Sequence, residues 1–205
     1  MFSREKVLYS AACIQEKTGV AQAGSIGLIL GSGLGAAMEG LKVRAELPYS
    51  EIEGFPCSTV IGHAGKLLLG EMAGKSMVVM SGRVHLYEGF DAATVCMPVR
   101  VLKELGVNTL IMTNAAGSLN HAFLAGSLML VDYHINFTGQ SPLSGPNEPA
   151  WGPRFPDGSR VYSPRLRDLA SRTARKLEYD LHRGVYMQVA GPQYETPAET
   201  RALRM

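Results

Sequence analysis

The segment at residues 82–89, Gly-Arg-Val-His-Leu-Tyr-Glu-Gly, combines side chains that could bind an anion. If it is extended, Arg83, His85 and Tyr87 lie on one face, because side chains alternate along a strand. A guanidinium matches phosphate oxygens with a planar fork, a histidine can donate a further hydrogen bond, and a tyrosine adds a hydroxyl. Glu88 could hold the histidine tautomer or neutralise excess positive charge. The pattern favours an anion site over an ordinary polar sheet face.

A second candidate is the glycine-rich loop at residues 31–36, Gly-Ser-Gly-Leu-Gly-Ala. It satisfies the G-x-G-x-x-A pattern of dinucleotide-binding loops, and Glu51 and Glu53 lie about twenty residues further on. That fold needs a helix and a parallel strand before the acid, but only about ten residues separate the loop from Glu46. The other interpretations are that the Ser32 hydroxyl and backbone amides face an anion such as phosphate, or that the loop is a tight turn without a ligand.

Three further positions in loops or at strand ends carry candidate groups. His63 lies at a predicted hairpin tip, where a solvated histidine is the simplest interpretation. Residues 114–117, Asn-Ala-Ala-Gly, follow an apolar run, and such small residues let backbone amides approach an anion closely. Glu195 precedes a predicted helix, where a carboxylate stabilises the helix dipole. Alternatively, the Glu195 carboxylate accepts hydrogen bonds from N–H groups of a flat ligand on which Tyr194 stacks.

The elements that must position these groups are a mixture of strands and helices, which indicates an α/β fold. Apolar runs predict strands at residues 25–30, 58–61, 66–71, 76–80, 107–113, 127–135 and 185–190. Short glycine-containing gaps between the second, third and fourth of these runs predict antiparallel pairing. Capping residues predict helices at 3–18, 91–105, 163–178 and 196–205. The Gly- and Pro-rich stretch at 136–160 is long for a connector, which suggests a functional loop.

Composition limits the class of protein. The 205 residues are 46% hydrophobic and 19% charged, which excludes intrinsic disorder. A net charge of +2 argues against nucleic acid or an acidic membrane as partner. The 3 cysteines are widely spaced and form no disulfide framework or metal motif. No apolar leader or membrane span is evident, so a soluble, cytoplasmic protein in a reducing compartment is expected.

Together and in this order, the motifs resemble one family, the trimeric purine nucleoside phosphorylases. The resemblance covers essentially the whole chain and rests on residues 31–35, 62–65, 82–89, 114–117 and 190–196, with further matches at 132–136 and 154–156. It implies a single domain over residues 1–205, with a mixed, partly barrel-like central sheet flanked by helices, assembled as a homotrimer. In the family, a later segment supplies further ligand-binding residues. The resemblance therefore implies that the domain is truncated at its C-terminus and that these residues alone are nearly inactive.

The family's activity is reversible phosphorolysis, in which a purine (deoxy)ribonucleoside and inorganic phosphate give the free base and (deoxy)ribose 1-phosphate. Phosphate is the co-substrate, and neither a cofactor nor a metal is implied. The resemblance assigns phosphate binding to Ser32, His63, Arg83, His85 and the Ala115 backbone. It assigns the ribose to Tyr87, the purine to Asn114, Ala115, Tyr194 and Glu195, and a neighbouring subunit's site to Phe155. The catalytic residues it implies are His85, Glu88, which orients the phosphate side, and Glu195.

The chemistry agrees with these assignments. Breaking the glycosidic bond builds positive charge on the ribose, which a clamped phosphate stabilises before it attacks C1′. Adenine lacks the N1–H that Glu195 would accept, so 6-oxopurine nucleosides such as inosine, guanosine and xanthosine are expected as substrates over adenosine. Two other functions stay open, a NAD-dependent oxidoreductase and a non-catalytic protein that binds phosphate or nucleosides.

Overall fold

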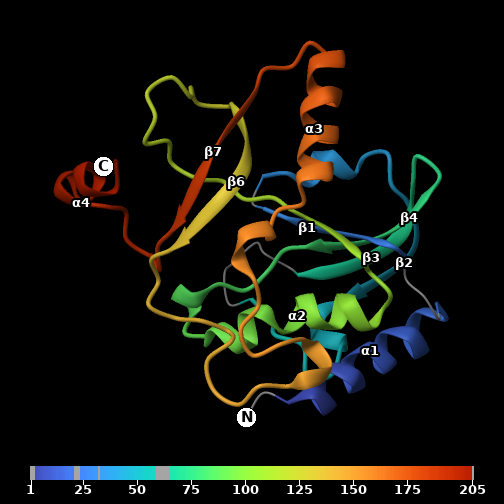
Figure 1. Ribbon diagram of the computed structural model, residues 1–205. Coiled ribbons are helices and arrows are strands. Elements are labelled where there is room, and N and C mark those ends of the chain that lie inside the picture. The colour runs from blue at the N-terminus through green and yellow to red at the C-terminus, as the bar shows by residue number, and fades with distance from the viewer. Residues whose placement is uncertain (1–2, 21–23, 32, 59–64, 205) are drawn as a thin grey trace. The chain divides into compact units, whose positions relative to one another are not determined.

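The computed structural model of the chain describes residues 3–20, 24–31, 33–58 and 65–204. These residues form two compact units, Met1–Ala115 and Ala116–Met205. The helices are α1 (Arg4–Thr18), α2 (Ala92–Glu104), α3 (Pro164–Lys176) and α4 (Pro197–Arg204). These helices separate runs of strands, in the order that the sequence predicts (Figure 1).

A mixed five-stranded sheet forms the centre of the first unit. Its order is β2-β3-β4-β1-β5, with bounds β1 (Ile26–Leu30), β2 (Lys42–Pro48), β3 (Lys66–Met72), β4 (Lys75–Ser81) and β5 (Thr109–Met112). β1 pairs in parallel with both β4 and β5, whereas β2, β3 and β4 are antiparallel. The mixed sheet and the β3–β4 hairpin confirm the prediction. The barrel-like closure implied by the resemblance stays a prediction.

One strand in the structure was not predicted, and one predicted strand falls mostly on residues that are not described. β2 was not expected, although its alternating Lys-Val-Arg-Ala-Glu-Leu pattern is typical of a half-buried strand. The pattern is weak because its apolar residues are few. In the structure, Val43 is 49% exposed, so the strand is buried only in part. Of the strand expected at 58–61, residues 59–61 lie outside the described residues, and Ser58 has no regular structure.

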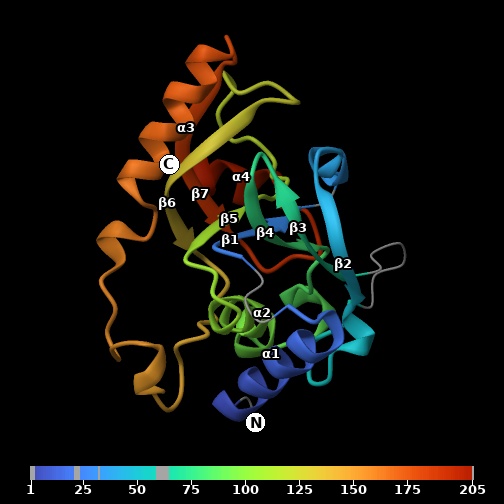
Figure 2. The same ribbon diagram turned by 90° about the vertical axis from the view of Figure 1, so that its right-hand side faces the viewer.

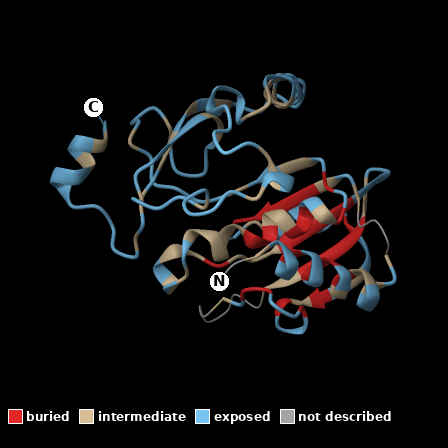
Figure 3. Cartoon of the chain, turned by 60° about the horizontal axis from the view of Figure 1, so that its bottom comes forward, coloured by how far each residue is buried: buried red, intermediate tan, exposed pale blue. Residues whose placement is uncertain are grey.

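Helices α1 and α2 lie side by side on one side of this sheet (Figure 2). Both begin where their caps predict, since the Ser3 side chain accepts from the Lys6 amide and Asp91 from the Thr94 amide. The buried core of the described residues lies in this unit (Figure 3) and includes Val7, Ile14, Leu67, Leu69, Val78, Val79, Val101, Leu102 and Leu105. These core residues come mainly from β3, β4, α1 and α2.

The second unit contains a two-stranded parallel sheet of β6 (Leu128–Asn136) and β7 (Leu181–Gln188), with α3 packed beside it. β7 begins four positions before the predicted start at 185, because pairing with β6 extends from Leu128 opposite Leu181. No residue from 116 to 204 is buried, so apolar side chains such as Val185 remain exposed. The stretch 136–160 is an irregular loop with two short 3-10 turns, which agrees with the prediction.

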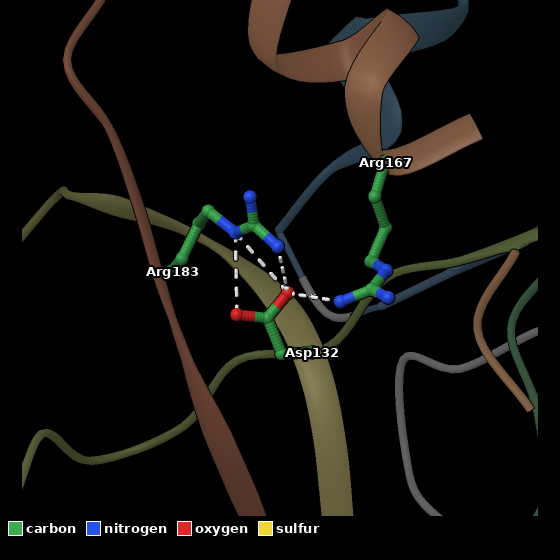
Figure 4. Close-up of polar contacts among 3 residues, drawn as sticks. All are labelled: Asp132, Arg167 and Arg183. Carbon is green, nitrogen blue, oxygen red and sulfur yellow. Dashed lines mark hydrogen bonds and ion pairs between the residues drawn. The ribbon is translucent and has the colours of Figure 1, made fainter. Parts of the chain in front are cut away.

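An ion-pair cluster joins β6, β7 and α3 in this unit. Asp132 accepts hydrogen bonds from Arg183 at 2.7 Å and 3.1 Å and also from Arg167 (Figure 4). The bonds from Arg183 lower the pKa of the Asp132 carboxyl below its ordinary value of 3.8, Arg167 adds a smaller effect, and burial acts in the opposite direction. A lowered pKa means that the folded state favours the ionised carboxylate.

Asp132→Asn is expected to lower Tm by about 2–4 °C at pH 7. Because the folded pKa is depressed, the stabilisation is present above the unfolded pKa and is lost as pH falls through the folded one. The difference in Tm should therefore begin to shrink as pH falls below about 4 and vanish only below the lowered pKa of the folded state. Thermal unfolding from pH 7 to pH 3 measures it, with Asp180→Asn, whose side chain is 88% exposed, as control. A difference that persists unchanged at low pH contradicts the prediction.

Candidate functional site

The ends of three neighbouring parallel strands place most of the predicted phosphate-binding segments at one edge of the sheet. β4, β1 and β5 run in parallel, with Leu30 opposite Ser81 and Ile29 opposite Met112. Gly31, Arg83 and Asn114 therefore follow the same ends of adjacent strands. Open α/β sheets bind ligands in this position.

Thr113 connects the three segments. Its carbonyl oxygen accepts a hydrogen bond from Nη1 of Arg83 at 2.7 Å, and its hydroxyl oxygen accepts one from the Gly31 amide at 2.9 Å. A methyl group at Gly31 would lie only 2.7 Å from the Asn114 Cα, so this close approach requires glycine. The glycine loop, the arginine and the Asn-Ala-Ala-Gly segment are thus held together by direct contacts.

Glu88 fixes the ring of His85. Its Oε1 accepts from the His85 amide at 2.8 Å and lies 2.9 Å from the ring Nδ1, while its Oε2 accepts from the Ser58 hydroxyl at 3.0 Å. The Glu88 side chain is 1% exposed and that of His85 is 23% exposed. An ionised carboxylate in this position accepts a proton carried by Nδ1, which makes Nε2 the ring nitrogen for a ligand contact. The predicted Glu88–His85 pairing is confirmed.

The extended conformation expected through Tyr87 is wrong beyond His85. Residues Leu86–Glu88 form a 3-10 turn, which the reciprocal bonds between His85 and Glu88 stabilise as a capping box. Alternation along a strand therefore does not place Tyr87 beside His85. Instead, the turn stacks the two rings with centroids 4.7 Å apart and planes 14° apart. Tyr87 is 45% exposed at this position.

The remaining predicted site residues fall into separate groups. Asn114 and Ala115 belong to the first unit, where Nδ2 of Asn114 donates to the Ala115 carbonyl at 3.1 Å. Tyr194 and Phe155 belong to the second unit and are 94% and 89% exposed. Glu195 is also an exposed residue of this unit. Ser32 and His63 lie outside the described residues.

The helix after Glu195 begins as the sequence predicts. The Thr196 amide donates to Glu199 at 2.7 Å, and the Glu199 amide donates to the Thr196 hydroxyl at 3.2 Å. This is the expected capping box, and it leads into α4. Glu195 therefore directly precedes a capped helix end.

The loop after β1 does not have the arrangement of a dinucleotide-binding unit. It leads into a 3-10 turn, Gly35–Met38, and then into β2. Among the described strands, β2 pairs only with β3, in antiparallel orientation, and lies three positions away from β1 in the sheet. The parallel strand that should follow the loop is thus missing from this position, which contradicts the NAD-dependent alternative.

Across the described residues, no helix has both the length and the apolar character needed to span a membrane. The same part of the chain contains no cluster of His, Cys, Asp or Glu side chains suited to a metal ion.

Comparison with known proteins gives consistent matches. A family model described as the phosphorylase superfamily matches residues 25–205. Purine nucleoside phosphorylase 1 of Bacillus subtilis (strain 168) is 49% identical over 201 residues, covering 98% of this chain and 73% of the relative. The structure of isoform 2 of purine nucleoside phosphorylase from Schistosoma mansoni in complex with cytosine and ribose-1-phosphate matches with a TM-score of 0.92 and 40% identity, covering 100% of this chain and 73% of that one.

A second solved structure, the Schistosoma purine nucleoside phosphorylase in complex with guanosine, matches with a TM-score of 0.89 and 40% identity over 99% of this chain and 72% of that one. The relatives are longer than this chain, which spans 73%, 66% and 64% of the length of three of them. The order of the motifs, the mixed sheet and these matches agree. The chain belongs to the phosphorylase superfamily and, within it, to the purine nucleoside phosphorylases.

Proposed function

We propose that this protein catalyses the reversible phosphorolysis of purine nucleosides, and that the strand ends of β4, β1 and β5 bind the phosphate. The observation that carries the proposal is the Thr113 junction, which holds Arg83 and the glycine loop together. Relatives with the same fold are named as purine nucleoside phosphorylases and were crystallised with ribose-1-phosphate and with guanosine.

On the phosphate side, Arg83 supplies a fixed positive charge and Ser32, His63 and the Ala115 amide supply further donors. Glu88 binds Nδ1 of His85 at 2.9 Å, so Nε2 is the ring nitrogen that contacts the phosphate. These contacts together orient the phosphate oxygens toward C1′ of the sugar. Its negative charge stabilises the cationic ribose before the new C–O bond forms.

On the nucleoside side, Tyr87 binds the ribose 3′-hydroxyl, and Glu195 accepts the N1–H of a 6-oxopurine. This hydrogen bond strengthens as negative charge develops on the departing base, so it favours the transition state over the ground state. The family resemblance also assigns purine binding to Tyr194, Asn114 and Ala115. The exposure of Tyr194 suits a side chain that packs on a planar ligand.

The assembly and location follow from the family resemblance. We propose a homotrimer in which Phe155, 89% exposed within its own chain, reaches the site of a neighbouring subunit. A cytoplasmic location and a reaction that needs phosphate but no cofactor belong to the same proposal.

The test is phosphate-dependent release of hypoxanthine from inosine, followed by the absorbance change of a coupled oxidation and by chromatography of the products. Release that rises with phosphate concentration and yields ribose 1-phosphate in equal amount supports the proposal. Release without phosphate, which would indicate hydrolysis, overturns it. Turnover at ordinary enzyme rates contradicts the expectation that these 205 residues alone are nearly inactive. Binding of phosphate and hypoxanthine without turnover agrees with that expectation and assigns these residues a binding role only.

A further inference from the structure

Tyr49 is a buried tyrosine whose hydroxyl ends at the backbone of the proposed phosphate site. It follows β2 at the start of the 3-10 turn Tyr49–Glu51 and is only 2% exposed. A buried hydroxyl needs a hydrogen-bond partner, and this one donates to the carbonyl oxygen of Gly82 at 2.8 Å. Burial raises the pKa of the hydroxyl above its ordinary value, so it remains a donor. Gly82 directly precedes Arg83.

The ring of Tyr49 also packs against a second backbone segment. A methyl group at Gly65 would lie 2.1 Å from Cδ2 of this ring, and the Tyr49 amide donates to the Gly65 carbonyl at 2.9 Å. The ring of Phe55 packs against that of Tyr49 at a tilt of 50°, with ring centroids 4.9 Å apart. Tyr49 therefore bridges the segment that enters β3 and the turn that leaves β4.

The turn at Gly82 is the kind of segment that needs such support. Its φ of +101° is readily adopted only by glycine, whose backbone is also the least restricted in other conformations. The orientation of the peptide after Gly82 sets the direction in which the Arg83 side chain leaves the backbone. The guanidinium at the other end donates to the Thr113 carbonyl at 2.7 Å.

We propose that Tyr49 is a positioning residue for phosphate binding, which holds the Gly82 peptide and thereby sets the guanidinium of Arg83. Arg83 is then fixed at both ends, through its backbone by Tyr49 and through its side chain by Thr113. Tyr49 acts only through Gly82 and does not touch substrate. This inference rests on the proposed function, because it assumes that Arg83 binds phosphate.

Tyr49→Phe removes the hydroxyl and keeps the ring that packs on Gly65 and Phe55. The dissociation constant for inorganic phosphate, measured by titration calorimetry, is expected to rise about three- to tenfold. KM for phosphate should rise by the same factor, while kcat at saturating phosphate changes less than about twofold. Amide hydrogen exchange should become faster in residues 82–88 but not in α1.

Ser10→Ala is the matched control. Ser10 is 0% exposed, and its hydroxyl donates to the carbonyl of Glu53 at 2.7 Å, so the substitution removes the same kind of buried bond at a distance from the strand ends. Both variants are compared below their unfolding temperatures. The control should lose thermal stability but keep the wild-type affinity for phosphate.

An unchanged phosphate affinity in Tyr49→Phe, or an equal loss in Ser10→Ala, overturns the inference and leaves Tyr49 with a structural role. If the wild-type chain itself binds no phosphate, the proposed function fails. The exchange data then decide the positioning role separately: faster exchange confined to residues 82–88 supports it, and unchanged exchange there overturns it.

Discussion

Arg83→Met is expected to lower kcat/KM for phosphate by about two to three orders of magnitude. The Thr113 carbonyl orients the guanidinium before phosphate arrives, so the enzyme does not spend binding energy on ordering this side chain. A methionine of similar length fills the space but offers neither the charge nor the planar donors. Initial rates of hypoxanthine release from inosine over a range of phosphate concentrations give the effect, and titration calorimetry gives the change in phosphate affinity.

Two further variants distinguish the effect of the Arg83 charge from that of its planar donor geometry, and both from the loss of a positive charge elsewhere on the protein. Arg83→Lys keeps the charge without the fork, so its kcat/KM should fall between those of wild type and Arg83→Met. Arg44→Met removes an arginine that is 66% exposed on β2 and paired with Glu71 at 2.8 Å, and it should change kcat/KM less than about twofold. If Arg83→Met keeps the wild-type KM for phosphate, the assignment of Arg83 to phosphate binding is wrong.

Glu195→Gln is expected to lower kcat/KM for inosine by about two orders of magnitude and to narrow the preference for inosine over adenosine. The carboxylate is an acceptor only, so it pairs with the N1–H of a 6-oxopurine and faces the lone pair of adenine N1 unfavourably. The glutamine amide loses the charge-assisted hydrogen bond to the N1–H of the 6-oxopurine, and its NH₂ group can donate a hydrogen bond to N1 of adenine. Parallel assays of inosine and adenosine phosphorolysis measure both effects.

Glu199→Gln is the control for the loss of a negative charge beside the same helix end. Its amide oxygen can still accept from the Thr196 amide, which Glu199 now binds at 2.7 Å, so the cap is retained. The ratio of inosine to adenosine activity should therefore remain unchanged in this variant. If Glu195→Gln keeps the wild-type ratio, or Glu199→Gln changes it equally, the assignment of Glu195 to purine N1 is wrong.

Features that depend on near neighbours in the chain could be predicted from the sequence. The caps at Ser3, Asp91 and Thr196 form as expected, because each joins residues only three positions apart. Glu88 reaches His85 over the same separation. The α/β class and the antiparallel β3–β4 hairpin followed from apolar runs and short glycine-containing turns.

The expectation for Tyr87 shows the limit of local patterns. Residues 83–87 alternate as a strand would, yet Glu88 reaches back to the His85 amide and closes a 3-10 turn. Alternation predicts a face only where a neighbouring strand pairs with the segment, and none pairs with these described residues. The position of Glu88 stabilises the turn. The residue types alone fit both this turn and an extended conformation, so they did not show which of the two forms.

The residue types, the caps and the order of the motifs were thus determined by the sequence alone, because each depends on groups a few positions apart. The tertiary structure decided which distant groups meet: Gly31 with Thr113, 82 positions away, and Tyr49 with Gly82, 33 positions away. The physical reason is that strand order and register, set by burial of the whole sheet, determine which strand ends become neighbours. No local spacing contains that information.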